Sequence, residues 1–196
     1  MLEDYEKLVV QQKVEKLEVF TGIETKNKYS ILTDQGKDIL FAYEESNWFS
    51  RVLLKQSRPL LINFIDNNKN NFLKIEKKFA FFFPEFSILN SDNQLIAKVK
   101  TRFGLNSRLE VYDNNNQLVF FLKNQVMHPW TFNIYKSKSD ENSIALISKK
   151  FSGLSKEFFT NADNFVIDFN QIKTEEEKKI ILALSLIIDL FVFESR

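Results

Sequence analysis

The chain closes with a segment that would be hydrophobic on every side of a helix. Between Ile180 and Phe193, in IILALSLIIDLFVF, only Ser185 and Asp189 are polar, and neither Pro nor Gly interrupts the run. A helix without a polar face has to be surrounded completely, either by lipid or by its own protein. What surrounds this segment therefore decides which folds the chain can adopt.

The residues before this segment predict where the helix begins. Thr174 is followed by three acidic residues, and Glu177 stands at the position that a capping box gives to Glu. Acidic side chains in a first turn also suit the positive end of the helix dipole. We expect a helix over residues 174–194. Its structural residues would be Thr174, Glu177, Ile180, Leu184, Ile187, Asp189 and Phe191.

Length and charge favour a buried helix over a membrane span. The apolar stretch has fourteen residues, or ~21 Å of helix, whereas a bilayer core is ~30 Å thick and needs roughly 20 apolar residues. A carboxylate such as Asp189 is costly in lipid, but it can find a partner in a protein interior. The sequence therefore predicts a helix enclosed by the protein itself.

The middle of the chain, from Tyr29 to Phe169, has the pattern of short strands. Hydrophobic residues recur at every second position in segments such as YSIL, ILFAY, LLINFI, RLEVY and WTFNIY. Such alternation puts one set of side chains on a core and the other in water. Asn- and Asp-rich clusters, among them TDQGKD, DNNKNN, NSDNQ, DNNNQ and SKSDEN, separate the segments and favour turns. Successive antiparallel hairpins of this spacing indicate a sandwich or a barrel.

The two patterns together predict one architecture. A helix that must be covered on all sides, in a chain of many strands, predicts a mainly β protein whose closed antiparallel barrel surrounds the helix. We expect a single domain over residues 1–196, with an N-terminal segment (1–28), barrel strands (29–172) and the central helix. For the stretch from Leu8 to Phe20, a strand and a helix both remain open.

The composition excludes several classes of function. The chain has no cysteine and one histidine, His128, which rules out thiolate metal sites, cysteine nucleophiles and ordinary zinc sites. It has no nucleophile elbow, P-loop or dinucleotide fingerprint, so we do not expect an enzyme. A net charge of +1 argues against nucleic acid as a partner. The charged start, MLEDYEKLVVQQK, lacks the apolar region of a secretory signal, so we do not expect secretion.

Several distinctive stretches are spread over the whole chain. They are LVVQQKVEKLEVFTGIETKNKYSI, AYEESNWFSR, SRPLLINFIDN, LISKKFSGLSKEFFTNADNFVIDF and the closing LIIDLFVFES. These stretches resemble the phospholipid scramblase family, which is grouped with Tubby-like and LURP-one-related proteins. The ISK…ADNF block and the terminal helix with its Asp189 are the most specific parts of the resemblance.

The resemblance implies a Tubby-like barrel of about twelve strands around a buried C-terminal helix. It also implies ATP-independent, calcium-stimulated movement of phospholipids between leaflets, and a location at the cytoplasmic face of the plasma membrane or in the cytoplasm. In animal members the helix has been described as a membrane span, which conflicts with the length argument. This chain lacks their cysteine clusters, so attachment through acyl chains is not carried over.

The calcium segment that the resemblance implies is degenerate in this chain. Asn161 and Ile172 stand where the family has its first and last Asp. Calcium takes roughly six to eight oxygen ligands, and only Asn161, Asp163 and Asp168 remain to supply them. In a strand, Asn161 and Asp163 share a face, and Asp168 lies on the other. We therefore expect weak calcium binding at best. The alternative is a polar turn leading into a core strand that carries Phe165, Ile167 and Phe169.

The stretch KKFAFFFPEF is a candidate site of another kind. One interpretation is a strand that is buried on both faces, or a strand that packs against the N-terminal segment. The other is a loop that enters a membrane, where each Phe removed from water contributes ~1.5–3 kcal/mol and Pro84 suits the loop. The predicted lipid-contact residues of this loop are Phe79, Phe81, Phe82, Phe83, Phe86, Lys77 and Lys78.

Three cations alternate in sequence a little further on. Lys98, Lys100 and Arg102 share one face of a predicted strand. They suit the phosphates of lipids or of nucleic acid, and the alternative is an ordinary solvated face.

The leading hypothesis for function is a phospholipid scramblase-like protein that moves phospholipids across the bilayer in both directions. The alternative is a Tubby-like module that docks on membranes and binds lipid without moving it. A third hypothesis is a regulatory protein that binds other macromolecules through its surface. The expected partner is a phospholipid membrane, and the oligomeric state stays open.

Overall fold

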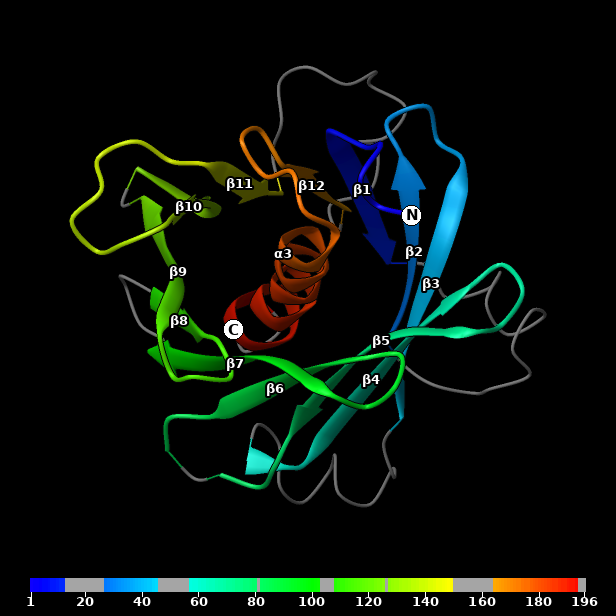
Figure 1. Cartoon of the computed structure of the whole chain (residues 1–196), viewed down its shortest axis with the longest axis horizontal. Helices are drawn as coiled ribbons and strands as arrows, with labels where there is room; N and C mark the ends of the chain where they lie inside the picture. The colour runs from blue at the N-terminus through cyan, green and yellow to red at the C-terminus, as the bar shows by residue number, and fades with distance from the viewer. Residues whose placement is uncertain are drawn as a thin grey trace.

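A closed barrel of twelve antiparallel strands surrounds one long helix (Figure 1). The computed structural model describes residues 1–12, 27–45, 57–80, 82–102, 108–125, 127–149 and 164–193. The strands are β1 (Lys7–Gln12), β2 (Lys28–Thr33), β3 (Asp38–Glu45), β4 (Leu60–Asp66), β5 (Asn71–Lys77), β6 (Glu85–Asn90), β7 (Leu95–Arg102), β8 (Arg108–Tyr112), β9 (Leu118–Gln125), β10 (His128–Tyr135), β11 (Ala145–Ser148) and β12 (Asn164–Asp168). The helix α3 (Glu175–Ile188) continues into a π-helical turn, η3 (Asp189–Phe193).

Each strand pairs with its neighbours in sequence, and β1 closes the barrel by lying between β12 and β2. Val9 marks this closure, because it is in register with Val166 on one side and Leu32 on the other. The beginning of the chain therefore supplies a barrel strand, so the stretch that was open from Leu8 to Phe20 is a strand up to Gln12, and its residues 13–20 lie outside the described part of the chain. The predicted fold class is confirmed.

Three hairpin turns use the same local chemistry. In the turns after β4, β6 and β8, the side-chain oxygen of Asp66, Asn90 or Asp113 accepts hydrogen bonds from two backbone N–H groups further along the turn. One later residue in each turn takes a positive φ, at Lys69, Asn93 and Asn116. Asn and Asp thus provide the tight turns that glycine provides in other proteins.

The helix fills the barrel. Inward side chains of every strand form one hydrophobic cluster with α3. From Ile180 to Ile188 every residue of α3 is buried, so the helix has no solvent-facing side over this stretch. Within the described residues, no helix is long and apolar enough to cross a membrane.

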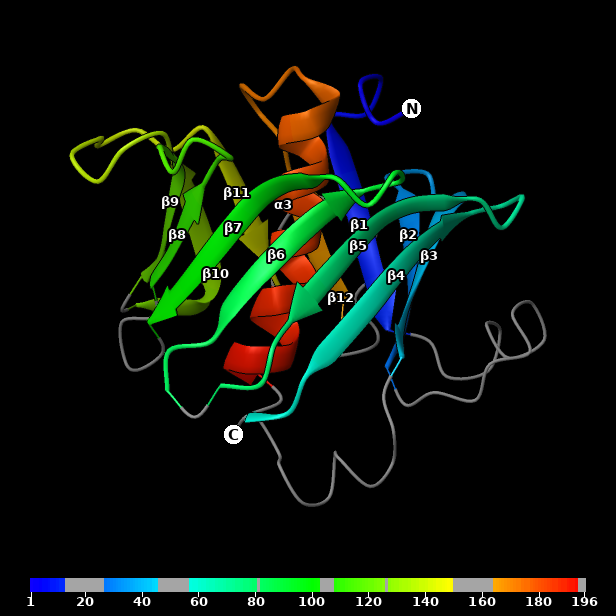
Figure 2. The same ribbon diagram turned by 60° about the horizontal axis from the view of Figure 1, so that its bottom comes forward.

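The two ends of the barrel differ, and Figure 2 shows them as an upper and a lower rim. The upper rim holds the start of α3 and the polar turns after β2, β4, β6, β8 and β10. The lower rim holds the end of η3 and the connections from β5 to β6 and from β9 to β10. Consecutive antiparallel strands put alternate connections at opposite ends, so residues far apart in sequence meet at one rim.

Candidate functional site

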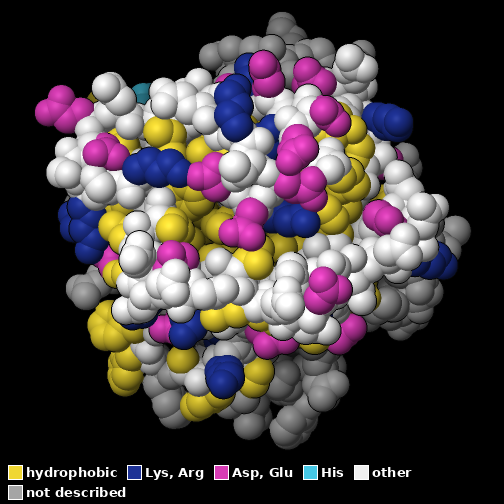
Figure 3. Space-filling model, in the orientation of Figure 1, with side chains coloured by type: hydrophobic (Ala, Val, Ile, Leu, Met, Phe, Trp, Pro, Cys, Tyr) yellow, Lys and Arg dark blue, Asp and Glu magenta, His cyan; other side chains and the backbone are white. Residues whose placement is uncertain are grey.

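Large hydrophobic side chains are exposed at the lower rim. Phe82 is 82% exposed and Phe83 is 76% exposed in the connection from β5 to β6, and Phe79 is also exposed there. Met127, which is 83% exposed, lies in the turn from β9 to β10. Among the described residues, Met1 is the only other exposed large hydrophobic residue. Figure 3 shows hydrophobic side chains, with basic ones beside them, at the lower left edge of the molecule near β6.

The aromatic connection is held in an unusual backbone conformation. Phe83 has a φ of 51°, a region that is costly for a bulky residue, and it precedes a proline, which disfavours this geometry further. The Thr101 hydroxyl of β7 donates a hydrogen bond of 2.8 Å to the Pro84 carbonyl oxygen and fixes the connection to the barrel. Backbone strain of this kind concentrates at functional sites. The conformation keeps two adjacent Phe side chains in water.

The structure places two of the predicted lipid-contact residues inside the barrel. Phe86 is fully buried, and its ring packs edge-on against Phe191 of η3 with ring centres 4.8 Å apart. Lys77 is 2% exposed, and its Nζ donates to the Arg58 carbonyl oxygen at 2.5 Å. Both residues have the parity of inward side chains on their strands, which is why they turn away from the surface. Of the others, Lys78 is exposed, and Phe81 lies outside the described residues.

Lys77 belongs to a polar group at the base of the aromatic connection. Its amine lies 5.5 Å from the centre of the Phe191 ring. Arg58 pairs with the Glu44 carboxylate, which also accepts a hydrogen bond of 2.6 Å from the Asn27 amide. Burial first, and the Arg58 charge second, lower the pKa of Lys77 to about 8. The connection is therefore exposed and aromatic at its tip, and at its base it contacts the last turn of the central helix.

The last turn of the helix holds a buried carboxylate. Asp189 is 2% exposed. It accepts a hydrogen bond of 2.9 Å from the Tyr29 hydroxyl and pairs with Lys149 Nζ at 3.1 Å. The Lys149 amine also lies over the Phe165 ring. The acid in the middle of an apolar segment thus has partners from β2 and from the residue after β11.

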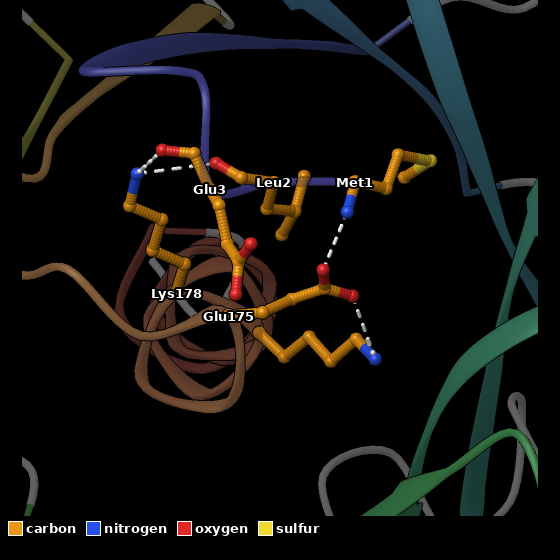
Figure 4. A network of polar contacts seen from close by, with 6 residues as sticks. Met1, Leu2, Glu3, Glu175 and Lys178 are labelled. Carbon is orange, nitrogen blue, oxygen red and sulfur yellow. Dashed lines mark hydrogen bonds and ion pairs between the residues drawn. The ribbon is translucent and has the colours of Figure 1, made fainter.

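The opposite end of the helix is tied to the upper rim, as Figure 4 shows. Thr174 is the N-cap: its Oγ1 accepts from the Glu177 N–H and donates to the Glu177 carboxylate. The amino group of Met1 lies 2.5 Å from Glu175 and lowers the pKa of that carboxyl. The buried Lys178 amine donates to three carbonyl oxygens of the first residues, those of Leu2, Glu3 and Tyr5.

The predicted cationic stripe is split by its register. Lys100 of β7 lies opposite Glu85 on one side and Glu110 on the other, and its amine covers the Tyr112 ring. Lys98 lies opposite Tyr112. Arg102 lies opposite another cation, Arg108, at the lower end of β7 and β8.

The described residues do not form a calcium site. Asp168 pairs with Lys7 at 3.4 Å and accepts from the Asn170 N–H at 3.1 Å, so both carboxylate oxygens are already engaged. Asn161 and Asp163 lie outside the described residues. Within the described part of the chain, no three acidic or histidine side chains gather in a way that would hold a metal. Strand β12 and the residue after it instead supply buried core residues: Phe165, Ile167 and Phe169.

Sequence reasoning missed three residues at the lower rim. Met127 stands alone in a turn and has no periodic signal. Arg108 and Lys123 do show a signal, because each alternates with inward-facing residues in LEVY and VFFL. Their position beside other cations depends on strand register, however, and the sequence alone does not fix that register.

Comparison with known proteins identifies the family. The scramblase family model matches residues 1–195. The chain belongs to the scramblase family. It is 29% identical to mouse phospholipid scramblase 1 over 210 residues, with 98% of this chain and 62% of that protein covered. Human phospholipid scramblase 1 is 27% identical over 225 residues, covering 99% of this chain and 65% of that protein. The chain thus spans less than two thirds of the length of these scramblases.

Two further proteins are similar to the chain at lower identity. A fission yeast protein, phospholipid scramblase family protein C343.06c, is 25% identical over 83% of this chain and 45% of its own length. A crystal structure of an Arabidopsis thaliana protein aligns with a TM-score of 0.55 over 96% of both chains, at 13% sequence identity. At that identity the likeness concerns the fold alone.

Proposed function

We propose that this scramblase-family protein acts at phospholipid bilayers and moves phospholipids between the two leaflets without ATP, and that it contacts the bilayer through its lower rim. Membership of the family supports the activity. The choice of the lower rim as the contact surface rests on one observation. Two aromatic side chains, Phe82 and Phe83, are exposed to water at that end of the barrel. A soluble protein seldom exposes such groups unless they contact another surface.

The closed barrel limits how lipid movement would occur. A phospholipid crosses slowly because its headgroup must pass through hydrocarbon. Within the described residues, the interior of this barrel is filled by α3 and by the hydrophobic side chains that pack against it. Movement would therefore take place along the outside of the protein, either in bilayer disturbed by the inserted aromatic residues or in a groove between copies of the chain.

A second candidate function is membrane docking and lipid binding without movement between leaflets. The enclosure of α3 within its own barrel favours this alternative, because the only long helix of the described residues is fully occupied by the protein core. Calcium stimulation is a separate part of the proposal. It has little support in the described residues, since Asp168 already has its partners.

A liposome assay separates these functions. The protein is reconstituted with vesicles that carry a fluorescent phospholipid, and leaflet exposure is followed in calcium and in EDTA. Movement faster than in empty vesicles supports the first function, binding without movement supports the second, and a difference between calcium and EDTA is required for calcium stimulation. Absence of both binding and movement would overturn the proposal.

The aromatic pair supplies the matching variant. Each Phe withdrawn from water contributes ~1.5–3 kcal/mol, so changing Phe82 and Phe83 to Ser should weaken vesicle binding at least about 100-fold. Both side chains are exposed, so folding should change little. The control is Phe82→Leu with Phe83→Leu, which keeps apolar side chains at the same positions and should retain most of the binding. Equal binding by the Ser variant would remove the lower rim from the proposal.

A further inference from the structure

We propose that a basic row formed by Arg108 and Lys123 binds the phosphate groups of anionic phospholipids beside the lower rim. This inference rests on the proposed action at bilayers and names the class of lipid and the residues that would select it. It also gives the docked barrel an orientation, with η3 directed toward the bilayer and the start of α3 directed away.

The row is defined by strand register. Arg102 of β7 lies opposite Arg108 of β8, and Arg108 lies opposite Lys123 of β9. Directly opposed side chains of neighbouring strands have Cβ atoms about 4.5–5.5 Å apart, and like charges in these positions destabilise a sheet. On its other side Lys123 meets the neutral Asn133. The row therefore concentrates positive charge without an acidic neighbour in register.

The adjacent row shows the usual arrangement of surface charges. There Glu85, Lys100 and Glu110 follow one another across β6, β7 and β8, so the charges alternate in sign. Glu110 additionally pairs with Lys138 and accepts from the Tyr112 hydroxyl. The contrast between neighbouring rows of one surface indicates that the basic row is completed by an anion from outside the chain.

The two described side chains of the row are accessible. Arg108 and Lys123 are both exposed. The Lys123 amine lies 4.8 Å from the centre of the Tyr135 ring, a cation–π contact that holds the side chain at this surface. An arginine next to an ordered lysine suits phosphate oxygens, which Arg can bind through two parallel hydrogen bonds.

The row lies between the exposed hydrophobic residues of the lower rim. On one side, the bond between Thr101 and the Pro84 carbonyl oxygen joins the end of β7 to the aromatic connection. On the other side, Lys123 stands two residues before the end of β9, which leads to Met127. At ~3.4 Å per residue that is about 7 Å along the strand. Apolar groups that enter the acyl boundary by about 5–10 Å would bring such cations to the level of the lipid phosphates.

The opposite rim carries charges of both signs and so differs from the basic row. Its turns contain Asp34, Asp66, Asp92, Asp113 and Asp140 together with Lys37, Lys69 and Lys138. Figure 3, which looks onto this rim, shows acidic and basic side chains side by side around the start of the helix. Because the net charge of the chain is only +1, orientation on a membrane would follow from this distribution of charge and not from its total.

Co-sedimentation with vesicles tests the inference. The vesicles contain either phosphatidylcholine alone or phosphatidylcholine with phosphatidylserine, and the variant is Arg108→Gln with Lys123→Gln. A basic residue at an anionic surface is worth roughly fivefold in affinity, so the pair should lose about 25-fold on phosphatidylserine vesicles. Its binding to phosphatidylcholine alone should stay the same. The control, Lys37→Gln with Lys173→Gln, removes two exposed lysines from the upper rim and should keep wild-type affinity.

The outcomes of this experiment distinguish three statements: the role of the basic row, the proposed function, and the assignment of the ligand as a lipid. Equal losses in the variant and the control would overturn the basic row but leave the proposed function intact. No binding of the wild-type chain to any vesicle would overturn both. An added arm with a single-stranded oligonucleotide distinguishes the other polyanion: tighter binding to the oligonucleotide than to the vesicles, lost in the Arg108 and Lys123 variant, would overturn the assignment to lipid. Raising the salt concentration should abolish the preference for phosphatidylserine in the wild type.

Discussion

Replacing Asp189 by Ala tests the mechanism that holds the end of the central helix inside the barrel. Asp189 accepts from Tyr29 at 2.9 Å and pairs with Lys149 at 3.1 Å. The Asp189 and Tyr29 side chains are almost completely buried, and Lys149 is mostly so. The variant would therefore remove one side of a buried ion pair and the acceptor of a buried hydroxyl in a single change.

The expected loss of stability follows from these contacts. Breaking a buried ion pair by removing one partner costs about 3–5 kcal/mol, and a hydrogen bond to a charged group contributes about 1.5–3 kcal/mol. The two terms overlap, because the same carboxylate makes both interactions. We expect the free energy of unfolding to fall by about 4 kcal/mol, a large part of the roughly 5–15 kcal/mol that stabilises a domain.

Chemical denaturation with related variants separates the two contributions. Tyr29→Phe should cost about 2 kcal/mol, because it removes only the hydrogen bond. Asp189→Asn keeps an acceptor for Tyr29 but loses the charge, so it should fall between the Phe and Ala variants. The double variant, Tyr29→Phe with Asp189→Ala, should be less destabilised than the sum of the single variants, since both remove the same hydrogen bond.

The absence of cysteine provides a second measurement. Ser185 is fully buried in α3, so Ser185→Cys places a single thiol in the barrel core. Labelling of that thiol under native conditions reports how often the barrel opens, and Asp189→Ala should accelerate it. A loss of stability below about 1 kcal/mol, with unchanged labelling, would refute the reasoning. It would mean that the cost of burying the charge cancels what its partners contribute.

Two further predictions concern Lys77 and Thr174. The pKa of Lys77 is lowered to about 8 by burial and by the Arg58 charge, so unfolding takes up a proton between pH 8 and the ordinary lysine pKa of 10.5. The free energy of unfolding should therefore rise with pH across this window. Lys77→Met should remove that rise, as denaturation at several pH values would show, and an identical pH profile in the variant would contradict it. Thr174→Ala should cost about 1 kcal/mol by removing the N-cap, and Thr174→Ser should restore it. Equal stability of the Ala and Ser variants would argue against the cap.

Local chemistry made the helix and the turns predictable. The Thr174 hydroxyl acts on an N–H group three residues away, and Asp66 acts on groups two and four residues away. Such contacts depend on sequence neighbours alone. The barrel followed from a different argument, in which an apolar helix too short for a bilayer had to be enclosed by the strands around it.

The aromatic segment shows where the prediction lost accuracy. It treated the stretch from Lys77 to Phe86 as one block, although Lys77 shares parity with the inward Ile75, and Phe86 shares it with the inward Ile88. The alternation of inward and outward side chains along each strand assigns Lys77 and Phe86 to the strands. Only the residues between the two strands then belong to the loop. Lys77 was predicted to contact lipid, whereas its amine is buried and donates a hydrogen bond to the Arg58 carbonyl oxygen.

The basic row could not be predicted from the sequence, for a different reason. Arg108 and Lys123 lie on separate strands, and a shift of one residue in either hairpin would turn one of them inward. The closure of β1 onto β12 is equally non-local, because it joins Lys7 to Asp168. Features of this kind depend on long-range pairing, which alternation and turn chemistry constrain but do not specify.

The position of the helix bears on how a protein of this family acts on a bilayer. If the helix left the barrel and entered the bilayer, lipid could surround it in place of the strands. No other group would then fill the space that the helix leaves inside the barrel. Inward side chains such as Ile62, Phe120 and Phe132, all fully buried, would then line a large empty cavity. Truncating one such side chain already costs about 2–5 kcal/mol, so the loss of a whole helix exceeds the stability of a domain. Departure of the helix would amount to unfolding, and under the proposed function a folded molecule would therefore meet the bilayer with its outer surface.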